Sequence, residues 1–144
     1  VGWEVIEHIK NPKEIVSHCW KILNDQGVLV MSTPNVCGFD FEILGPQNRS
    51  YSPPGHLIYF NPESLTRLLR ESGFARVEIT TPGVLDVDNV RNEVLRAQYE
   101  VSLPRFLEKI LLENTDEAAQ AREFLQKSIV LSNMSSHMVA IAWK

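Results

Sequence analysis

Three polar side chains lie within five residues near the start of the chain, Glu4, Glu7 and His8 in the stretch VGWEVIEH. Carboxylates and an imidazole at this spacing can bind a polar ligand, and a neutral imidazole can accept a proton from a hydroxyl group. Apolar residues precede them, as at the end of a strand, and ligands of open α/β sheets bind beyond the carboxyl ends of the strands. A plainer reading pairs Glu4 with His8 and leaves Glu7 in solvent, and the residues alone do not separate the two readings.

A second histidine lies in a long segment, residues 35–61, that shows no clear periodicity. His56 stands there in PPGHLIYF, beside Tyr59 and Phe60. Disordered segments are poor in aromatic residues, and long loops in compact domains are usually functional, so we expect an ordered lid or pocket wall. His56 either faces a ligand or caps the turn before the next helix, and Phe60 fits a hydrophobic staple better than a ligand contact.

The remaining candidates are weaker. Asn35 follows a predicted strand and either contacts a ligand or simply ends the strand. Ser136 and His137 are neighbours in a strand and point to opposite faces, so we expect no nucleophile pair there. A metal site would need His8, His18, Cys19 and a carboxylate, but adjacent residues on a helix diverge, so no metal is predicted.

The length, composition and net charge of the chain argue against several classes of protein. The 144 residues suit one domain, and 44% hydrophobic content is ordinary for a globular chain. A net charge of −4 argues against a nucleic-acid partner. The longest apolar run is too short for a membrane span, and two cysteines are consistent with reduced thiols in a cytoplasmic protein.

The order of the predicted elements is that of an α/β sheet. One helix is predicted to begin at Pro12 with Asn11 as its cap and to end at Gly27 in a left-handed turn, before a buried strand at 28–31. A second helix is predicted to begin after Asn61 and to end at Gly73, before a strand at 76–81. The opening residues 1–5 have the character of one more strand.

The last third of the chain is predicted to be helical, with a closing strand at 138–143. The first helix is indicated by Val87, Val90 and Val94. The second covers 104–112, with Phe106, Ile110 and Leu111 together, and the third runs from its cap Thr115 to about Lys127, with Phe124 and Leu125 inward.

The combination of these motifs resembles a known family. EVIEH, then NP, an amphipathic helix, a glycine turn and LVMSTPN are similar to the second half of a class I S-adenosylmethionine-dependent methyltransferase. The likeness is to the branch of ubiquinone-biosynthesis O-methyltransferases and bacterial small-molecule methyltransferases. It continues through GHLIYFNPESLTRLLRESGF and TPGVLDVDNVRNE to SSHMVAIAWK, so it extends over essentially the whole chain.

The resemblance implies a fold. Residues 1–144 would form the C-terminal part of one Rossmann-like methyltransferase domain, with strands four to seven of the sheet, the last antiparallel, and a helical insert at about 84–133. The family's glycine-rich cofactor turn and its ribose-binding acidic residue are not found, so we expect the chain to be a fragment that is inactive alone. Gln26 stands where the family usually has a glycine.

The resemblance also implies a site. Glu4, Val5, Glu7 and His8 would line S-adenosylmethionine, His8 and His56 would act in catalysis, and Asn35 and Tyr59 would contact a small-molecule methyl acceptor. O-methylation is the favoured reaction. The transfer needs mostly positioning, plus a base when the nucleophile carries a proton. The alternative is a non-catalytic half-domain that acts by association. We also expect a homodimer through the unpaired sheet edge or the helical insert.

Overall fold

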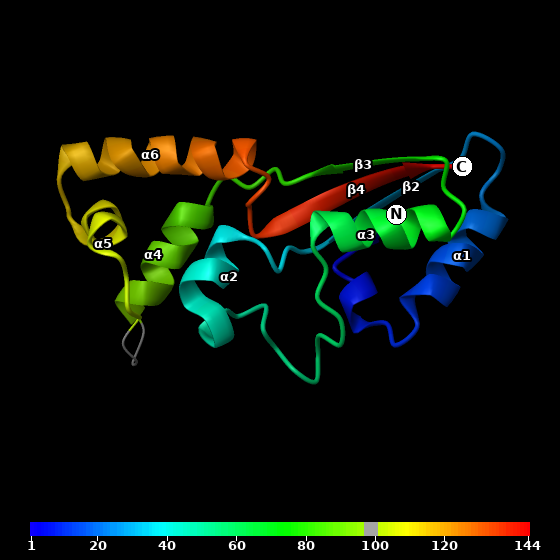
Figure 1. Cartoon of the computed structure of the whole chain (residues 1–144), viewed down its shortest axis with the longest axis horizontal. Helices are drawn as coiled ribbons and strands as arrows, with labels where there is room; N and C mark the ends of the chain where they lie inside the picture. The colour runs from blue at the N-terminus through cyan, green and yellow to red at the C-terminus, as the bar shows by residue number, and fades with distance from the viewer. Residues whose placement is uncertain (97–100) are drawn as a thin grey trace.

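The computed structural model describes residues 1–96 and 101–144, so residues 97–100 of the predicted helical insert lie outside the described residues. The strands and helices alternate in the first half of the chain, and helices follow in the second (Figure 1). The elements are β1 (Gly2–Trp3), η1 (Ile6–His8), α1 (Pro12–Ile22), β2 (Val28–Pro34), α2 (Phe39–Leu44), η2 (Gly45–Gln47), α3 (Pro62–Glu71), β3 (Arg76–Thr80), α4 (Asp86–Arg96), α5 (Arg105–Leu112), α6 (Asp116–Leu131) and β4 (His137–Trp143).

The four strands form one sheet in the order β1-β2-β4-β3. β1 is parallel to β2, with Gly2 opposite Met31, whereas β4 runs antiparallel to both β2 and β3. The predicted α/β class and the antiparallel last strand are therefore confirmed. β1 is shorter than the predicted strand at 1–5, because Glu4 has a φ of +51° and ends the extended backbone.

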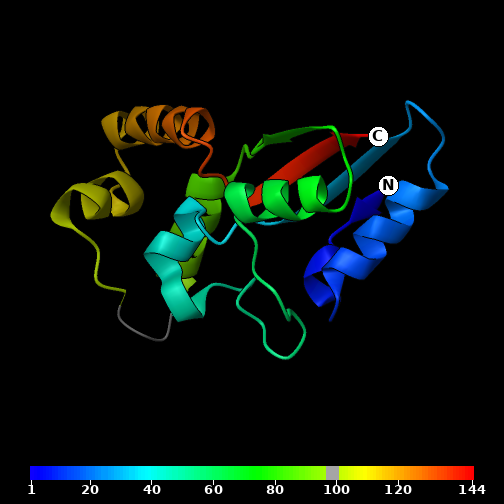
Figure 2. The same ribbon diagram turned by 45° about the vertical axis from the view of Figure 1, so that its right-hand side comes forward.

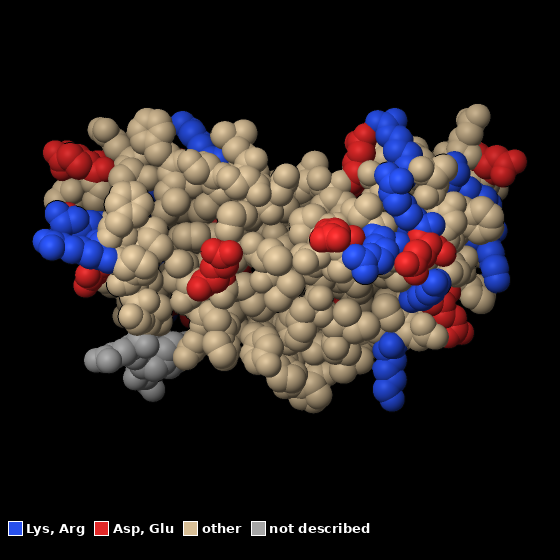
Figure 3. All heavy atoms as spheres, in the orientation of Figure 1, with Lys and Arg blue, Asp and Glu red and all other residues tan. Residues whose placement is uncertain are grey.

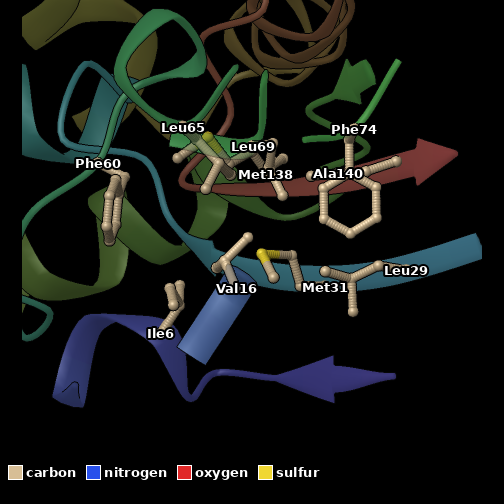
Figure 4. Packing of buried hydrophobic residues seen from close by; sticks show 11 residues of the cluster. Ile6, Val16, Leu29, Met31, Phe60, Leu65, Leu69, Phe74, Met138 and Ala140 are labelled. Carbon is tan, nitrogen blue, oxygen red and sulfur yellow. The ribbon is translucent and has the colours of Figure 1, made fainter. Parts of the chain in front are cut away.

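The hydrophobic core lies between one face of the sheet and the helices α1 and α3 (Figure 4). Leu65 and Leu69 of α3 and Val16 of α1 are fully buried there, against Met138 and Ala140 of β4. The predicted burial of strand 28–31 on both faces is wrong in part. Leu29 and Met31 face the core, but Val28 is exposed and Val30 is half-buried.

The helix ends agree with the sequence at α3 and differ at α1. The Asn61 side chain accepts a hydrogen bond from the Ser64 backbone N–H, and the Ser64 hydroxyl accepts one from the Asn61 backbone N–H, which completes a capping box. Asn11 makes no cap hydrogen bond; its backbone, with a ψ of 76°, lacks the extended conformation of Asn61, and its side-chain amide donates to Glu14. The left-handed turn after α1 falls on Gln26, with a φ of +68°, and not on Gly27.

The helices α4, α5 and α6 gather beyond one end of the sheet, as two views show (Figures 1 and 2). A second hydrophobic cluster holds them to α2. The predicted cap Thr115 is confirmed, since its side chain accepts from the Ala118 N–H. The inward placement of Phe106 and Phe124 is wrong: both are mostly exposed, while Ile110 and Leu111 form the buried side of α5.

The density of charged side chains on the surface differs along the molecule. Charged side chains gather toward the α1–α3 end and toward the far end of α5 and α6, with fewer over the middle (Figure 3). No helix in the described ranges is both long and apolar enough to cross a membrane.

Candidate functional site

The site is built where β1 and β2 reach the same edge of the sheet. Glu4 to His8 follow β1 directly, and Ser32 and Thr33 lie near the end of β2. The Glu4 backbone N–H donates to the Ser32 carbonyl at 3.1 Å, which continues the parallel pairing by one residue. The chain then turns into η1, so that Glu7 and His8 leave the sheet plane together.

Glu7 is almost fully buried, at 1% exposed, so the reading that placed it in solvent is wrong. Its Oε2 accepts a hydrogen bond from Thr33 Oγ1 at 3.0 Å. Its Oε1 has no hydrogen-bond partner among the described residues and lies 3.8 Å from Nε2 of His8. A buried carboxylate oxygen without a donor is costly, so this atom is a candidate acceptor for a cation or for the donor of a ligand.

The long segment 35–61 is ordered against this point. The Glu7 backbone carbonyl accepts from the backbone N–H groups of Leu57 and Ile58, at 2.8 and 3.2 Å. The segment also contains two short helices, α2 and η2, that the sequence did not predict. These main-chain bonds bring His56 next to His8, although 48 positions separate the two residues in the chain.

The two histidines face each other. Their ring centroids are 4.8 Å apart at an interplanar angle of 68°. Nδ1 of His8 lies 2.7 Å from the Gly55 carbonyl, and Nδ1 of His56 lies 2.6 Å from the Ser50 carbonyl. Since a carbonyl only accepts, each Nδ1 carries a proton and donates it, which leaves each Nε2 with a free lone pair in the neutral ring. The bond from His56 to the Ser50 carbonyl spans the turn before α3, as the turn-capping reading of His56 expects, while Asn61 caps the helix itself.

Glu7, His8 and His56 form a set that can hold a metal ion, with their ligand atoms all within 4.8 Å of one another. One carboxylate and two imidazoles suit divalent transition metals. Metal-binding histidines usually donate their second ring N–H to a carbonyl or carboxylate, as both histidines do here. Sequence reasoning predicted no metal and weighed a different set, His18 and Cys19 with His8. Only the fold brings His56 to Glu7, so no local signal could have shown this set.

A second polar group flanks the histidines. Ser32 Oγ donates to Oε1 of Glu4 at 2.6 Å, and Nε2 of His137 lies 3.3 Å from Oε2 of Glu4. The Glu4 carboxylate raises the pKa of His137 above its usual value. Burial raises the pKa of Glu4, but the hydrogen bonds from His137 and Ser32 outweigh it and leave the net pKa lowered. Glu4 thus pairs with His137 and not with His8.

The other predicted site residues divide into two groups. Tyr59 lies beside the histidines, with its ring 6.2 Å from that of His56 and stacked on Tyr51 at 5.4 Å. Val5 is about half exposed, between Glu4 and the buried Glu7. Asn35 is fully buried, its amide donates to the carbonyls of Ser135 and Asn133, and its oxygen accepts from a backbone N–H. This engagement favours the strand-ending role for Asn35 and separates it from the histidines.

Comparison with known proteins gives one family. A family model described as "Methyltransferase domain" matches residues 1–79, which include Glu7, His8 and His56. A protein of Mycolicibacterium smegmatis named "Probable S-adenosylmethionine-dependent methyltransferase" is 36% identical over 74 residues, 51% of this chain and 27% of that protein. A protein of Mycobacterium tuberculosis with the same description is 34% identical over 77 residues, 54% of this chain and 26% of that protein. The matches therefore span about a quarter of the relatives' length.

Solved structures share the fold. A SAM-dependent methyltransferase from Archaeoglobus fulgidus superposes with a TM-score of 0.56 at 18% identity, over 99% of this chain and 58% of that one. A SAM-dependent methyltransferase from Thermotoga maritima gives a TM-score of 0.52 at 14% identity, over 99% of this chain and 53% of that one. With the family match over more than half of the chain, this chain belongs to the methyltransferase domain family, the class I S-adenosylmethionine-dependent methyltransferases.

Proposed function

We propose that this chain forms part of a methyltransferase site that transfers a methyl group from S-adenosylmethionine to an oxygen of a small molecule. The observation that carries the proposal is the cluster of Glu7, His8 and His56, in which one buried carboxylate oxygen has no hydrogen-bond partner among the described residues and both imidazole rings donate through Nδ1 to carbonyls. Glu4, Val5, Glu7 and His8 are the proposed cofactor side of the same edge, and Tyr59 with Tyr51 the proposed wall for the acceptor.

The reaction assigns a role to the cluster. The acceptor oxygen attacks the methyl carbon of the sulfonium, the sulfur–carbon bond breaks, and the hydroxyl proton must leave the oxygen. A neutral Nε2 of His8 or His56 can accept that proton directly. A divalent cation held by the three side chains would instead make the hydroxyl more acidic and fix its position.

The geometry favours the cation. Nε2 of His8 and Oε1 of Glu7 are 3.8 Å apart, too far for a hydrogen bond, so neither satisfies the other. Both Nδ1 atoms already donate to carbonyls, which presents both Nε2 atoms as ligands. We therefore propose a divalent metal ion bound by Glu7, His8 and His56 and shared with the acceptor oxygen.

Calorimetric titration of Mn²⁺ and Zn²⁺ into the chain tests this proposal. We expect one site, weakened at least tenfold by Glu7→Gln or His56→Ala, because each change removes one of three ligands. His18→Ala is the matched control, since His18 is an exposed histidine on α1. Equal affinity in all forms, or no binding, would refute the metal and leave His8 and His56 as candidate bases.

The alternative is that the chain acts by association. The matched relatives are longer, and we propose that residues outside this chain complete the cofactor site and that the chain alone is inactive. Adenosylhomocysteine titrated into the chain and into the full-length gene product separates the two ideas. Binding to the full-length product alone supports an enzyme with this chain as one part. Binding to neither supports an association module.

A further inference from the structure

An open groove of about 950 Å³ lies between α6 and the residues that lead into α4. Residues 82–84 and the first turn of α4 form one wall, and α6 forms the other. In two views, α6 lies along the upper border of the helical group, away from α1 (Figures 1 and 2). None of Glu7, His8 and His56 lines the groove, so it is a surface separate from the candidate site.

Large apolar side chains in the groove are in contact with solvent. Leu131 is 85% exposed at the end of α6, and Val84 is 76% exposed on the opposite wall. Val130 is half-buried and Val87 is buried in the same groove, so the apolar surface continues from the rim to the floor. Contiguous apolar surface of this kind is typical of interaction sites in soluble proteins.

The α6 wall of the groove has a regular pattern. Four of its lining residues are four positions apart and exposed, namely Ala119, Glu123, Lys127 and Leu131. Residues at this spacing form one ridge along a helix, and twelve positions at a rise of about 1.5 Å give a ridge about 18 Å long. The ridge therefore carries, in order, a small residue, an acid, a base and a large apolar residue.

This order is complementary to its own reverse. When two copies of α6 cross antiparallel at the level of residue 125, Glu123 of each copy faces Lys127 of the partner subunit. Leu131 of each copy then faces the small Ala119 of the partner subunit. A crossing level with residue 123 or with residue 127 would instead place like charges opposite each other, so the charges select one register. Ridges of residues four apart pack together in the commonest class of helix pair, at about −50°.

The charges of Glu123 and Lys127 are available for such contacts. The two residues have the favourable order for an ion pair four positions apart on a helix, yet neither makes an ion pair with another described residue. The amino group of Lys127 lies instead 5.6 Å from the centroid of the Phe124 ring. On α5, Lys109 and Glu113 at the same spacing do pair, at 3.9 Å. Glu123 and Lys127 can therefore pair across an interface without breaking an ion pair within the described part of the chain.

We propose that this groove binds a second copy of the chain, with α6 against α6 in a two-fold homodimer. Two pairs of Glu123 with Lys127 fix the register, and Leu131 of each copy packs on Ala119 of the partner subunit. Of the two homodimer surfaces expected from the sequence, this proposal chooses the helical insert. Exposed ion pairs contribute little, and a single helix pair buries less surface than a standard interface, so the dimer is weak and forms at high protein concentration.

Sedimentation equilibrium of the chain between about 10 μM and about 1 mM measures the dimer dissociation constant. Glu123→Lys places four cations opposite one another, so we expect the constant to rise at least about tenfold. The double variant Glu123→Lys with Lys127→Glu restores opposite charges in exchanged positions, and we expect a constant within about threefold of the wild type. Glu108→Lys on α5 makes the same change of charge at an exposed position outside the groove, so it is the matched control and should have no effect.

A mixture of two variants tests the register directly. The Glu123→Lys chain is positive at both positions and the Lys127→Glu chain is negative at both, so we expect each chain alone to be monomeric and their equimolar mixture to form a heterodimer.

The apolar contact has its own pair of variants. Leu131→Ser should weaken the dimer about tenfold, because it removes the side chain that packs on Ala119 of the partner subunit. Phe106→Ser on α5 removes an apolar side chain that is 71% exposed and lies outside the groove, so it is the control and should leave the dimer unchanged. All of these positions are exposed, so we expect each variant to keep the circular dichroism of the wild type. If a variant loses its helical signal, the wild-type dimer is measured at about 1 M NaCl, where it should weaken because salt screens the ion pairs.

Several results would overturn the inference. They are a chain that stays monomeric up to about 1 mM, a dimer that neither Glu123→Lys nor high salt weakens, or a double variant that does not recover the dimer. A monomeric chain whose backbone amide signals at Lys127 and Leu131 shift on addition of 2-phenylethanol would show that the groove binds an apolar small molecule instead. The inference does not depend on the proposed function, since no metal or cofactor is present in these measurements and no residue of the histidine cluster is changed.

Discussion

The ion pair between Glu4 and His137 makes the stability of the fold depend on pH in a defined window. The pair joins the turn after β1 to the start of β4, and its Nε2–Oε2 distance is 3.3 Å. Replacing Glu4 by Gln removes the charge but keeps an oxygen for the Ser32 hydroxyl. The lost free energy of unfolding should therefore report mainly on the interaction with His137.

The direction of the pH dependence follows from the pKa shifts of Glu4 and His137. The pKa of Glu4 is lowered from 4.5 in the fold, so its contribution is present above pH 4.5 and is lost as the pH falls through the folded value. The pKa of His137 is raised from 6.5, so its contribution is present below pH 6.5 and is lost as the pH rises through the folded value. Both groups are charged between these limits, and the pair stabilises the fold most there.

The coupling free energy between Glu4 and His137 is small because solvent screens the two charges. The side chains are 42% exposed for Glu4 and 53% for His137. Exposed pairs of this kind contribute about 0.2–1 kcal/mol to the free energy of unfolding, and we expect about 0.5 kcal/mol at pH ~5.5 and close to none at pH ~8.5.

A double-mutant cycle with Glu4→Gln and His137→Gln, measured by urea denaturation at the two pH values, gives this coupling free energy. The exposed pair of Lys13 and Glu71, 3.0 Å apart, is the control, since it contains no histidine. A Glu4–His137 coupling that is the same at both pH values, or larger at the higher one, would refute the reasoning.

The remaining predictions concern stability and are checked by the same denaturation. Leu69→Ala should lower the free energy of unfolding by about 2–5 kcal/mol, because Leu69 is fully buried in the core, whereas Leu131→Ser at an exposed position should change it by less than about 0.5 kcal/mol. Asn61→Ala should cost about 1 kcal/mol, since it removes the cap of α3. Gly73→Ala should cost about 1–3 kcal/mol, because φ is +111° and a Cβ would lie 2.9 Å from the Trp20 ring. An unchanged midpoint in Gly73→Ala would show that the turn relaxes.

The sequence predicted the elements whose signals are local. The apolar spacing of Leu65 and Leu69, the cap at Asn61 and the end of the helix before Gly73 each depend on neighbours within a few residues, and all three agree with the structure. Asn11 has the same residue type and the same following proline as Asn61, but its backbone conformation differs and its side chain makes no cap hydrogen bond.

The positions of the other side chains depend on tertiary contacts between segments that are distant in the sequence. Phe106 and Phe124 have core-like side chains, but the packing of α5 and α6 turns them outward. The spacing of Glu7 and His8 was enough to predict them as candidate site residues. The contact between His8 and His56 depends instead on how residues 55–58 bind to His8 and to the Glu7 backbone carbonyl. Asn35 has the type and position of a ligand contact, yet its amide is used by two distant carbonyls of the chain.

The attachment of Leu57 and Ile58 to the carbonyl of Glu7 uses backbone atoms only. The position of His56 is thus encoded in the main chain, and the identity of the side chain at 57, which is 46% exposed, is free to change. Proline is the exception, because it removes the donated N–H. Sequence variation at position 57 can therefore alter what an incoming molecule meets at the rim while the chemical groups beneath it keep their spacing, so recognition and chemistry can diverge independently in this part of the fold.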